Sequence, residues 1–309
     1  MTVGARHADP AWLMQAYAIC ERVARAHDEN FPVASRLLPA EMRPHVAALY
    51  AFARTADDFA DEGQRTAEDR HRLLDNWMAR LHACAREADL PADRPADQSD
   101  LIFLALGATI RARSLPVPLF EDLLSAFRQD ITTHRYATWE DLLAYCQRSA
   151  NPVGRLVLRI AGYADPALDR ASDALCTALQ LTNFWQDLDR DWRHGRLYVP
   201  ADDCDASAAR EVDLSARRMT DGWRSALARV AGRTRQCFAA GRAVCDGVHG
   251  RLRLELRLTW LGGVRILDRL ERVGFDVFSS RPSLGLADAP ALLWGAMRWR
   301  AGSTDSNEQ

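Results

Sequence analysis

The sequence predicts an all-α protein, and two observations support this fold class. Apolar residues recur at i, i+3, i+4 and i+7 along most of the 309 residues, which is the period of amphipathic helices. Proline stands at Pro39, Pro44, Pro118 and Pro152, where helices are expected to begin. Alternation typical of a strand is weak and confined to Leu197-Tyr198-Val199. We expect a single domain of about ten helices.

The expected helices follow one another along the chain, most of them defined by an apolar stripe. In chain order they cover Ala11 to Ala26, Pro44 to Asp61, Ala67 to Ala88, Asp100 to Arg113, Pro118 to Thr133, Trp139 to Ser149, Pro152 to Ala161, Ala167 to Trp192, Ser207 to Gly247, Arg251 to Arg272 and Ala289 to Arg300. The stretch Leu90 to Ser99, rich in Pro and Asp, is expected to be a link. We expect the domain to occupy residues 1–300 and residues 301–309 to form a flexible polar tail.

The composition excludes several classes of protein. Hydrophobic residues make up 48% of the chain, which indicates a globular protein. The formal net charge of −2, with no interleaving of basic and aromatic residues, predicts no nucleic-acid partner. All 40 basic residues are Arg, which excludes a Lys Schiff base and a P-loop lysine. Arginine is also the side chain best suited to binding phosphate oxygens in pairs.

The cysteines and the N-terminus predict where the protein resides. The seven cysteines are scattered without a CxxC pair, which argues against a disulfide framework or a zinc site. Residues 1–10 have no apolar stretch of signal-peptide type, and no run approaches the roughly 20 apolar residues that span a bilayer. We expect a cytoplasmic protein, and peripheral contact with the inner membrane stays open.

Two acidic clusters stand at the ends of predicted helices, Asp57-Asp58-Phe59-Ala60-Asp61-Glu62 and Asp187-Leu188-Asp189-Arg190-Asp191. A glycine of the kind that ends helices, Gly63 or Gly195, follows each cluster. Carboxylates at this end meet the negative pole of the helix dipole, at a cost of about 0.3–1 kcal/mol each. The repeated arrangement suggests that something strongly positive binds there.

Residues three or four apart share one face of a helix, and two stripes have this spacing: Tyr50, Arg54, Asp57 and Asp61 on the first helix, and Gln180, Asn183, Asp187 and Asp191 on the second. A polar stripe is often only a solvated face, and that alternative stays open. Paired carboxylates are ligands that Mg²⁺ prefers, together with substrate phosphate and water. With Arg54, Arg193 and Arg196 nearby for phosphate oxygens, the two pairs suggest the ionisation of a diphosphate.

Three motifs give the chain a resemblance to the head-to-head trans-isoprenyl diphosphate synthases, which include squalene and phytoene synthases. Asp57-Asp58-Phe59-Ala60-Asp61 resembles the family's first aspartate-rich motif, and Asn183 to Asp191, continuing to Pro200, resembles the second. Tyr145 to Gly154 is similar to the family's Val-Ala-Gly-x-Val-Gly helix break. The resemblance extends from about His27 to Arg281.

The resemblance implies an isoprenoid synthase fold, with helices around a central cavity, and it implies roles for particular residues. Asp57, Asp61, Asp187 and Asp191 would bind Mg²⁺, and the substrate would be a prenyl diphosphate. The diphosphate would contact Arg54, Asn183, Arg196 and Tyr198, while Tyr50, Tyr145 and Gln180 match catalytic positions in the cavity. His27 and Phe31 match a flap that closes over one diphosphate.

Two stretches, Glu29 to Ser35 and Glu255 to Gly263, resemble the bacterial hopanoid-pathway branch, the hydroxysqualene synthases. Ser149-Ala150-Asn151 replaces Val-Ala-Gly at the helix break, and Gly263 stands where many relatives have Tyr. In that branch a sister enzyme, which is a candidate partner, supplies presqualene diphosphate. The branch enzyme ionises it and lets water capture the cation to give hydroxysqualene, without NADPH. Asn151 could hold that water, although it also suits the N-cap before Pro152.

Two alternatives to this reaction remain. The first is a squalene or phytoene synthase that condenses two farnesyl or geranylgeranyl diphosphates itself. The second is a non-catalytic helical partner of a sister synthase, although the intact aspartate pairs argue against it.

Overall fold

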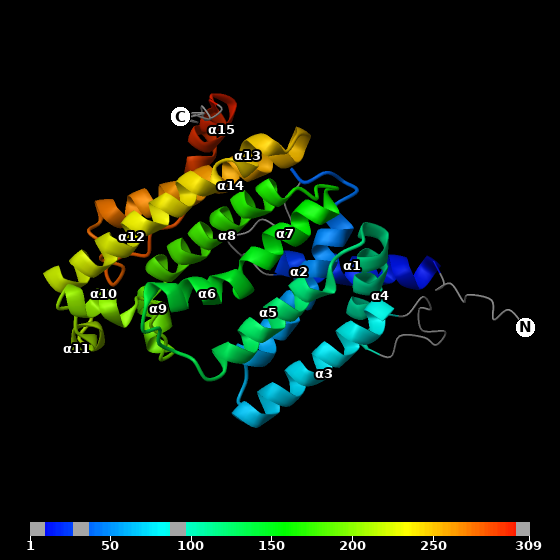
Figure 1. Cartoon of the computed structure of the whole chain (residues 1–309), viewed down its shortest axis with the longest axis horizontal. Helices are drawn as coiled ribbons and strands as arrows, with labels where there is room; N and C mark the ends of the chain where they lie inside the picture. The colour runs from blue at the N-terminus through cyan, green and yellow to red at the C-terminus, as the bar shows by residue number, and fades with distance from the viewer. Residues whose placement is uncertain (1–9, 27–36, 87–96, 301–309) are drawn as a thin grey trace, which may run out of the picture. The chain divides into compact units, whose positions relative to one another are not determined.

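The computed structural model describes residues 10–26, 37–86 and 97–300, and these residues are predominantly helical (Figure 1). The chain forms two compact units: Met1–Thr133 with Arg155–Ala164, and His134–Gly154 with Asp165–Gln309. The all-α prediction is confirmed, and the only strand-like pairing in the described ranges is an isolated bridge between Arg135 and Leu197. The expectation of one domain over residues 1–300 stays a prediction, and the predicted tail at 301–309 lies outside the described residues.

The first unit is built around the helix that carries the first acidic cluster. Its helices are α1 (Pro10–Ala26), α2 (Arg43–Asp61), α3 (Ala67–Arg86), α4 (Gln98–Arg113), α5 (Val117–Asp130) and most of α7 (Asn151–Ile160). Helix α2 packs against α1, α3, α4 and α5. Its fully buried Phe52 stacks on Trp77, with ring centroids 6.0 Å apart, and meets Phe120 edge-on at 5.5 Å. The acidic cluster is therefore attached to the centre of this unit.

The second unit is arranged in the same way around its own acid-bearing helix. It contains α6 (Trp139–Ser149), α8 (Pro166–Gln186), α9 (Leu188–Arg193), α10 (Ala201–Ala206), α11 (Glu211–Ser215), α12 (Asp221–Gly241), α13 (Val244–Gly247), α14 (Gly250–Arg272), η1 (Leu286–Asp288) and α15 (Ala289–Met297). Helix α8 packs against α6, α12, α13 and α14. The buried Trp185 of α8 donates from Nε1 to Thr234 Oγ1 of α12 at 2.9 Å, which fixes the two helices together.

Two long predicted helices are divided in the structure. The helix expected at Ala167 to Trp192 is interrupted at Asp187, between α8 and α9. The helix expected at Ser207 to Gly247 is replaced by α11, α12 and α13, because the backbone turns at Ala208 and Arg217, where φ is +54° and +51°. Pro39 lies in the turn before α2 and does not begin a helix. Apolar periodicity missed these turns because the short helices continue the same spacing.

The close crossing of α8 and α12 generates a prediction about two glycines of α12. A Cβ on Gly241 would lie 2.6 Å from the backbone N and 2.7 Å from Cα of Leu175, so Gly241→Ala should lower the free energy of unfolding by about 1–3 kcal/mol. Gly232 has open space at its Cβ position, so Gly232→Ala should raise stability by up to about 1 kcal/mol. Urea unfolding of both variants measures the difference. A Gly241→Ala protein as stable as the parent would contradict the packing.

Candidate active site

The first acidic cluster is organised by Arg54 of α2. Its Nη2 atom lies 2.7 Å from Asp58 Oδ1 and 2.9 Å from Glu62 Oε1, and its Nη1 lies 3.4 Å from Asp57 Oδ2. Asp58 and Glu62 are spaced i, i+4, and the Arg54 guanidinium bridges their carboxylates. This bridged pair lies next to the predicted metal-binding residues Asp57 and Asp61. The helical spacing places Asp57 and Asp61 on one face of α2.

Two further arginines neutralise the C-terminal end of α2. Arg70 donates from Nη1 to the carbonyls of Phe59 and Ala60 at 3.1 and 2.5 Å, and from Nη2 to Gly63 O at 2.9 Å. Arg65 donates to Glu62 O at 3.0 Å. These carbonyls have no partners within the helix, and cations stabilise this end of the dipole. The arginines therefore offset the cost of gathering carboxylates there.

In the second cluster, Asp187 is held by an arginine far away in the sequence. Arg281 Nε lies 2.5 Å from Asp187 Oδ1, and Arg281 Nη2 lies 3.0 Å from Oδ2. The hydrogen bonds to Asp187 raise the pKa of the Arg281 guanidinium above its usual value, and the negative charge of Asp191 adds to the effect. Asp187 and Asp191, the two predicted metal-binding aspartates of this stripe, thus both act on the guanidinium cation of Arg281. The buried Gln186 donates to Pro282 O at 2.5 Å and so anchors the segment that carries Arg281.

Asp189, which lies between these two aspartates in the sequence, has a different environment. Arg193 Nη2 approaches its Oδ2 at 2.7 Å, and Arg217 Nη1 approaches its Oδ1 at 2.6 Å. Arg217 also donates to Phe278 O at 2.9 Å. Asp189 therefore ties α9 to two other segments of the unit. This environment differs from that of Asp187, which is paired with Arg281.

A buried aromatic cluster lies beside the second acidic motif. Phe184 and Tyr198 stack with ring centroids 3.7 Å apart and planes inclined by 6°. Tyr145 lies 6.2 Å from both rings, and Tyr136 lies 5.5 Å from Tyr145. The structure thus brings together Tyr145 and Tyr198, which the sequence singled out separately. The negative faces of aromatic rings attract cations, so such a cluster could stabilise a carbocation.

The predicted helix break forms the junction of α6 and α7, where Asn151 and the hydroxyl oxygen of Ser149 are buried. Asn151 Oδ1 accepts a hydrogen bond from Thr177 Oγ1 of α8 at 2.9 Å, and both residues are buried. Ser149 Oγ is buried without a hydrogen-bond partner. Buried hydroxyls are nearly always hydrogen-bonded, so an orphaned one is suited to receive a water or a ligand.

The remaining predicted residues are placed as follows. Tyr50 is half-buried one turn before Arg54 on α2, and Gln180 and Asn183 are half-buried on α8. Arg196 follows α9, where its backbone N–H donates to Asp191 O at 2.9 Å. His27 and Phe31, the predicted flap residues, lie outside the described residues. Asp57 and Asp61 lie in the first unit, and Asp187 and Asp191 lie in the second.

The aspartate pairs fit a hard cation in the chemistry of their donors, which are carboxylate oxygens only. Within the described ranges, no three His, Cys, Asp or Glu side chains gather closely enough to hold a metal ion. Each unit therefore offers a pair, and further oxygen ligands would come from a diphosphate and water. This is the usual composition of a Mg²⁺ site with a phosphate substrate.

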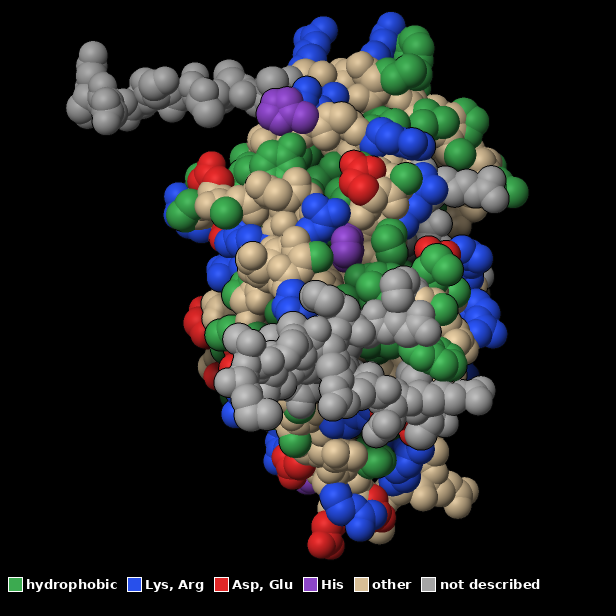
Figure 2. Space-filling model, turned by 90° about the vertical axis from the view of Figure 1, so that its right-hand side faces the viewer, with side chains coloured by type: hydrophobic (Ala, Val, Ile, Leu, Met, Phe, Trp, Pro, Cys, Tyr) green, Lys and Arg blue, Asp and Glu red, His purple; other side chains and the backbone are tan. Residues whose placement is uncertain are grey.

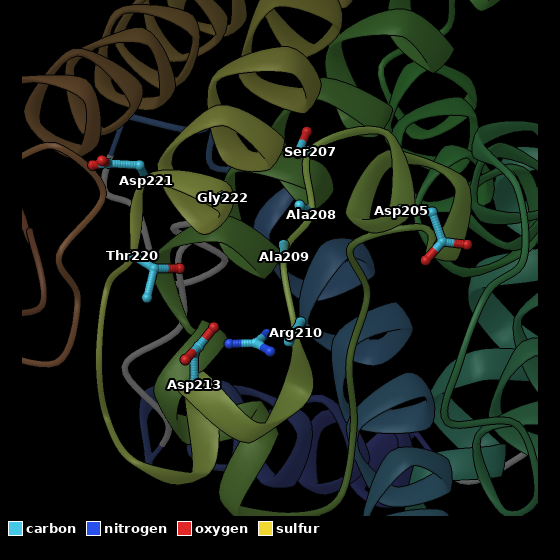
Figure 3. A pocket seen from close by; sticks show the side chains of 9 residues that line it. All are labelled: Asp205, Ser207, Ala208, Ala209, Arg210, Asp213, Thr220, Asp221 and Gly222. Carbon is cyan, nitrogen blue, oxygen red and sulfur yellow. The ribbon is translucent and has the colours of Figure 1, made fainter.

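Other candidate sites are weaker. Figure 3 shows an open pocket of the second unit, lined by Asp205, Ser207, Ala208, Ala209, Arg210, Asp213, Thr220, Asp221 and Gly222. None of the predicted site residues lines it, and its buried Asp213 is paired with Arg218 at 2.8 Å.

Burial raises the pKa of the Cys20, Cys176 and Cys245 thiols to about 12, which leaves them poor nucleophiles at neutral pH.

The sequence predicts no nucleic-acid partner and no membrane-spanning segment. Two observations on the described residues concern these predictions. Arginine side chains are scattered over the face in Figure 2. None of the helices in the described part of the chain has the length and apolarity that crossing a bilayer requires.

Sequence reasoning missed Arg281, Gln186, Thr177 and the ring partners Phe184 and Tyr136. The stripe on α8 contained a usable signal, because an acidic pair at a helix end needs a cation from elsewhere. The pattern could not identify which of the 40 arginines supplies it. Thr177 and the aromatic partners carry no pattern that separates them from ordinary core residues.

The all-α fold is that of the terpenoid synthase class, as in the solved structures that it resembles. The chain matches the squalene/phytoene synthase family over residues 24–288. It is 34% identical to hydroxysqualene synthase of Rhodopseudomonas palustris over 279 residues, which cover 89% of this chain and 90% of that protein. It is 35% identical to hydroxysqualene synthase of Zymomonas mobilis over 227 residues, 72% of each chain.

A solved structure extends the likeness to the fold. The crystal structure of a squalene synthase from Alicyclobacillus acidocaldarius is similar with a TM-score of 0.78 and 40% identity, and the match covers 86% of this chain and 97% of that one. The chain belongs to the squalene/phytoene synthase family. This is a family of isoprenoid synthases that act on prenyl diphosphates and generally use a divalent metal ion.

The arginine cap of α2 leads to a stability prediction. Arg70→Gln should lower the free energy of unfolding by about 1.5–3 kcal/mol, because charged hydrogen bonds to three carbonyls are lost. Arg72→Gln is the matched control, since Arg72 is exposed and forms an ion pair with Asp69 on its own helix, α3; its effect should stay within about 0.5 kcal/mol. Urea unfolding measures both. Equal effects of the two substitutions would show that the cap contributes nothing special.

Proposed function

We propose that this protein is a hydroxysqualene synthase, which converts presqualene diphosphate and water into hydroxysqualene and diphosphate with Mg²⁺ and without NADPH. The observation that carries this choice within the family is the polar helix break. Ser149 Oγ is buried without a partner, and Asn151 is fixed by Thr177. A synthase that ends its reaction on water needs such groups, whereas one that ends on a hydrocarbon does not.

The reaction begins with loss of the diphosphate, and the acidic clusters serve this step. Asp57 with Asp61 and Asp187 with Asp191 would hold Mg²⁺ together with diphosphate oxygens. When bound, Mg²⁺ would stabilise the negative charge that develops on the leaving diphosphate. Arg281 is proposed to exchange part of its contact with Asp187 for a diphosphate oxygen, a role suited to its forked donors.

Several side chains assist at the same stage. Arg54, Asn183, Arg196 and Tyr198 complete the diphosphate contacts, and His27 and Phe31 close over the substrate. Breaking the carbon–oxygen bond leaves both electrons on the diphosphate and a cyclopropylcarbinyl cation on the substrate. Tyr145 belongs to the buried aromatic cluster with Phe184 and Tyr198, whose ring faces stabilise that cation. Tyr50 and Gln180 orient the polyprenyl chain.

The reaction ends when a water held at the helix break attacks the rearranged cation. The water oxygen forms the new carbon–oxygen bond, and its lost proton passes to the diphosphate. Asn151 Oδ1 accepts one hydrogen bond from Thr177, and an amide oxygen has a second lone pair for a water proton. Ser149 Oγ supplies the second contact. Two fixed contacts hold the water in one orientation near an otherwise apolar substrate.

Cellular context follows from the same chemistry. Presqualene diphosphate must come from an enzyme that condenses two farnesyl diphosphates, so a sister synthase is the expected partner. We propose that the protein works in the cytoplasm. A squalene synthase remains the second candidate because the solved relative from Alicyclobacillus acidocaldarius carries that name.

Product analysis tests this proposal directly. Pure protein and Mg²⁺ are incubated with presqualene diphosphate or with farnesyl diphosphate, each with and without NADPH. We expect hydroxysqualene and diphosphate from presqualene diphosphate alone, identified by mass spectrometry of the extracted lipid. Efficient condensation of farnesyl or geranylgeranyl diphosphate, or a hydrocarbon product that requires NADPH, would overturn the proposal.

The aspartate pairs distinguish an enzyme from a helical scaffold. Asp57→Asn and Asp187→Asn should each lower turnover by about 10²–10³-fold and raise the Mg²⁺ concentration needed for half-maximal rate, with unchanged circular dichroism. Asp189→Asn is the control, because Arg193 and Arg217 hold that carboxylate and its loss should affect stability instead. Unchanged pathway output in cells carrying both Asp57→Asn and Asp187→Asn would favour the scaffold.

The water site generates a prediction about the product. Asn151→Ala and Thr177→Val should preserve diphosphate release but lower the alcohol-to-hydrocarbon ratio about two- to tenfold, the value of one hydrogen bond. Thr182→Val is the control, since its buried hydroxyl bonds Ala178 O within α8 and takes no part in the break. If Asn151→Ala gives the same rate and the same alcohol, Asn151 has only a structural role.

A further inference from the structure

Helix α15 is anchored to the second unit by one face only. Ala296 is buried, and Gly295 faces Leu261 of α14. The following Trp299 donates from Nε1 to Asp246 Oδ1 at 2.9 Å, and the Arg242 guanidinium lies 4.0 Å from its ring centroid. These contacts hold the helix firmly against α14, near the C-terminus in Figure 1.

The opposite face of α15 is apolar and exposed to solvent. Leu293, Trp294 and Met297 are 43%, 54% and 69% exposed, and Leu286 of η1 is 95% exposed. Met297 follows Leu293 by four residues and Trp294 by three, so the three side chains share one side of the helix. We call these four residues the α15 outer face. Isolated exposed apolar residues are ordinary, but an ordered group of four on adjoining helices is typical of an interaction surface.

The border of the outer face is positively charged. Arg298 lies over the Trp294 ring, with its guanidinium 4.3 Å from the ring centroid, and Arg300 is exposed just beyond it. The stretch from Ala289 to Arg300 contains no Asp or Glu. Asp288, which precedes it, is buried, and Arg265 Nε lies 2.7 Å from its Oδ1. No local carboxylate of α15 therefore cancels the charge of Arg298 and Arg300.

We propose that the α15 outer face docks the protein onto the surface of an anionic lipid bilayer. Leucine, Trp and Met side chains on one side of a short helix can enter the boundary between headgroups and acyl chains, while Arg side chains bind lipid phosphates. Tryptophan is also favoured at this boundary because its ring is partly polar. The helix has nine residues, too few to span a bilayer, so it lies in the surface.

Charge argues for lipid over a second copy of this chain. A symmetric dimer places each surface patch against the same patch on its partner. Contact through the outer face would bring Arg298 and Arg300 near their own copies, which is electrostatically unfavourable. Anionic phosphates complement the same arginines. The apolar and basic side chains of this surface are independent of the proposed reaction, although an apolar product of that reaction would also leave the protein most readily into a bilayer.

Vesicle flotation of the full chain tests docking without any substrate, so its result is independent of the proposed reaction. The protein should float with phosphatidylglycerol–phosphatidylcholine vesicles more than with phosphatidylcholine alone, and less at high salt. Leu293→Ser combined with Trp294→Ser and Met297→Ser should abolish flotation on both vesicle types. Arg298→Gln and Arg300→Gln should each lower binding to the anionic vesicles about fivefold at low salt.

Matched controls come from exposed residues elsewhere. Met14→Ser removes an apolar side chain that is 72% exposed on α1, and Arg170→Gln removes an exposed charge on α8; neither should change flotation. Circular dichroism confirms folding of every variant. The proposal is overturned if the parent protein does not bind anionic vesicles or if the controls lose as much binding as the α15 variants. A dimer that Trp294→Ser dissociates, without vesicle binding, would assign the surface to a second copy.

Discussion

Carboxylates gathered at the negative end of a helix need positive partners, and the candidate site depends on meeting this need. On α2 the charges are balanced by Arg54, with Arg65 and Arg70 on the terminal carbonyls. At the end of α8 the balance comes from Arg281, which pairs with Asp187. The two units solve the same electrostatic problem with arginines from different places. The proposed diphosphate chemistry uses these charges, because arginine binds phosphate as readily as carboxylate.

Rigid packing behind the acids is the second element of this arrangement. The acid-bearing helices α2 and α8 are each packed against several other helices of their own unit. Trp77 fixes α2 through its hydrogen bond to Phe52 O, and Trp185 fixes α8 through Thr234. Charged groups that repel one another keep a defined geometry only when their scaffold cannot relax. The central position of both helices supplies that constraint.

Polar and apolar groups exchange their usual places at two points in the second unit. At the α6–α7 junction, Asn151 and the Ser149 hydroxyl are buried, and this hydroxyl has no hydrogen-bond partner among the described residues. On α15, Leu293, Trp294 and Met297 are exposed although apolar. Both arrangements cost stability, so each is expected to have a use. In our proposals the first delivers a water to an apolar cation, and the second brings the protein to a lipid surface.

The sequence by itself determined the helical fold class, most helix positions and the two aspartate stripes, because all of these follow from spacing along a single helix. It also identified the polar departure at Ser149 and Asn151. Only the tertiary structure decided that Arg281, 94 residues from Asp187, balances that carboxylate, and that Thr177 orients Asn151. It also decided that the outer face of α15 is uncovered. The period of a helix shows which residues share one of its faces. Segments distant in the chain determine what covers that face and which residue pairs with a charge on it.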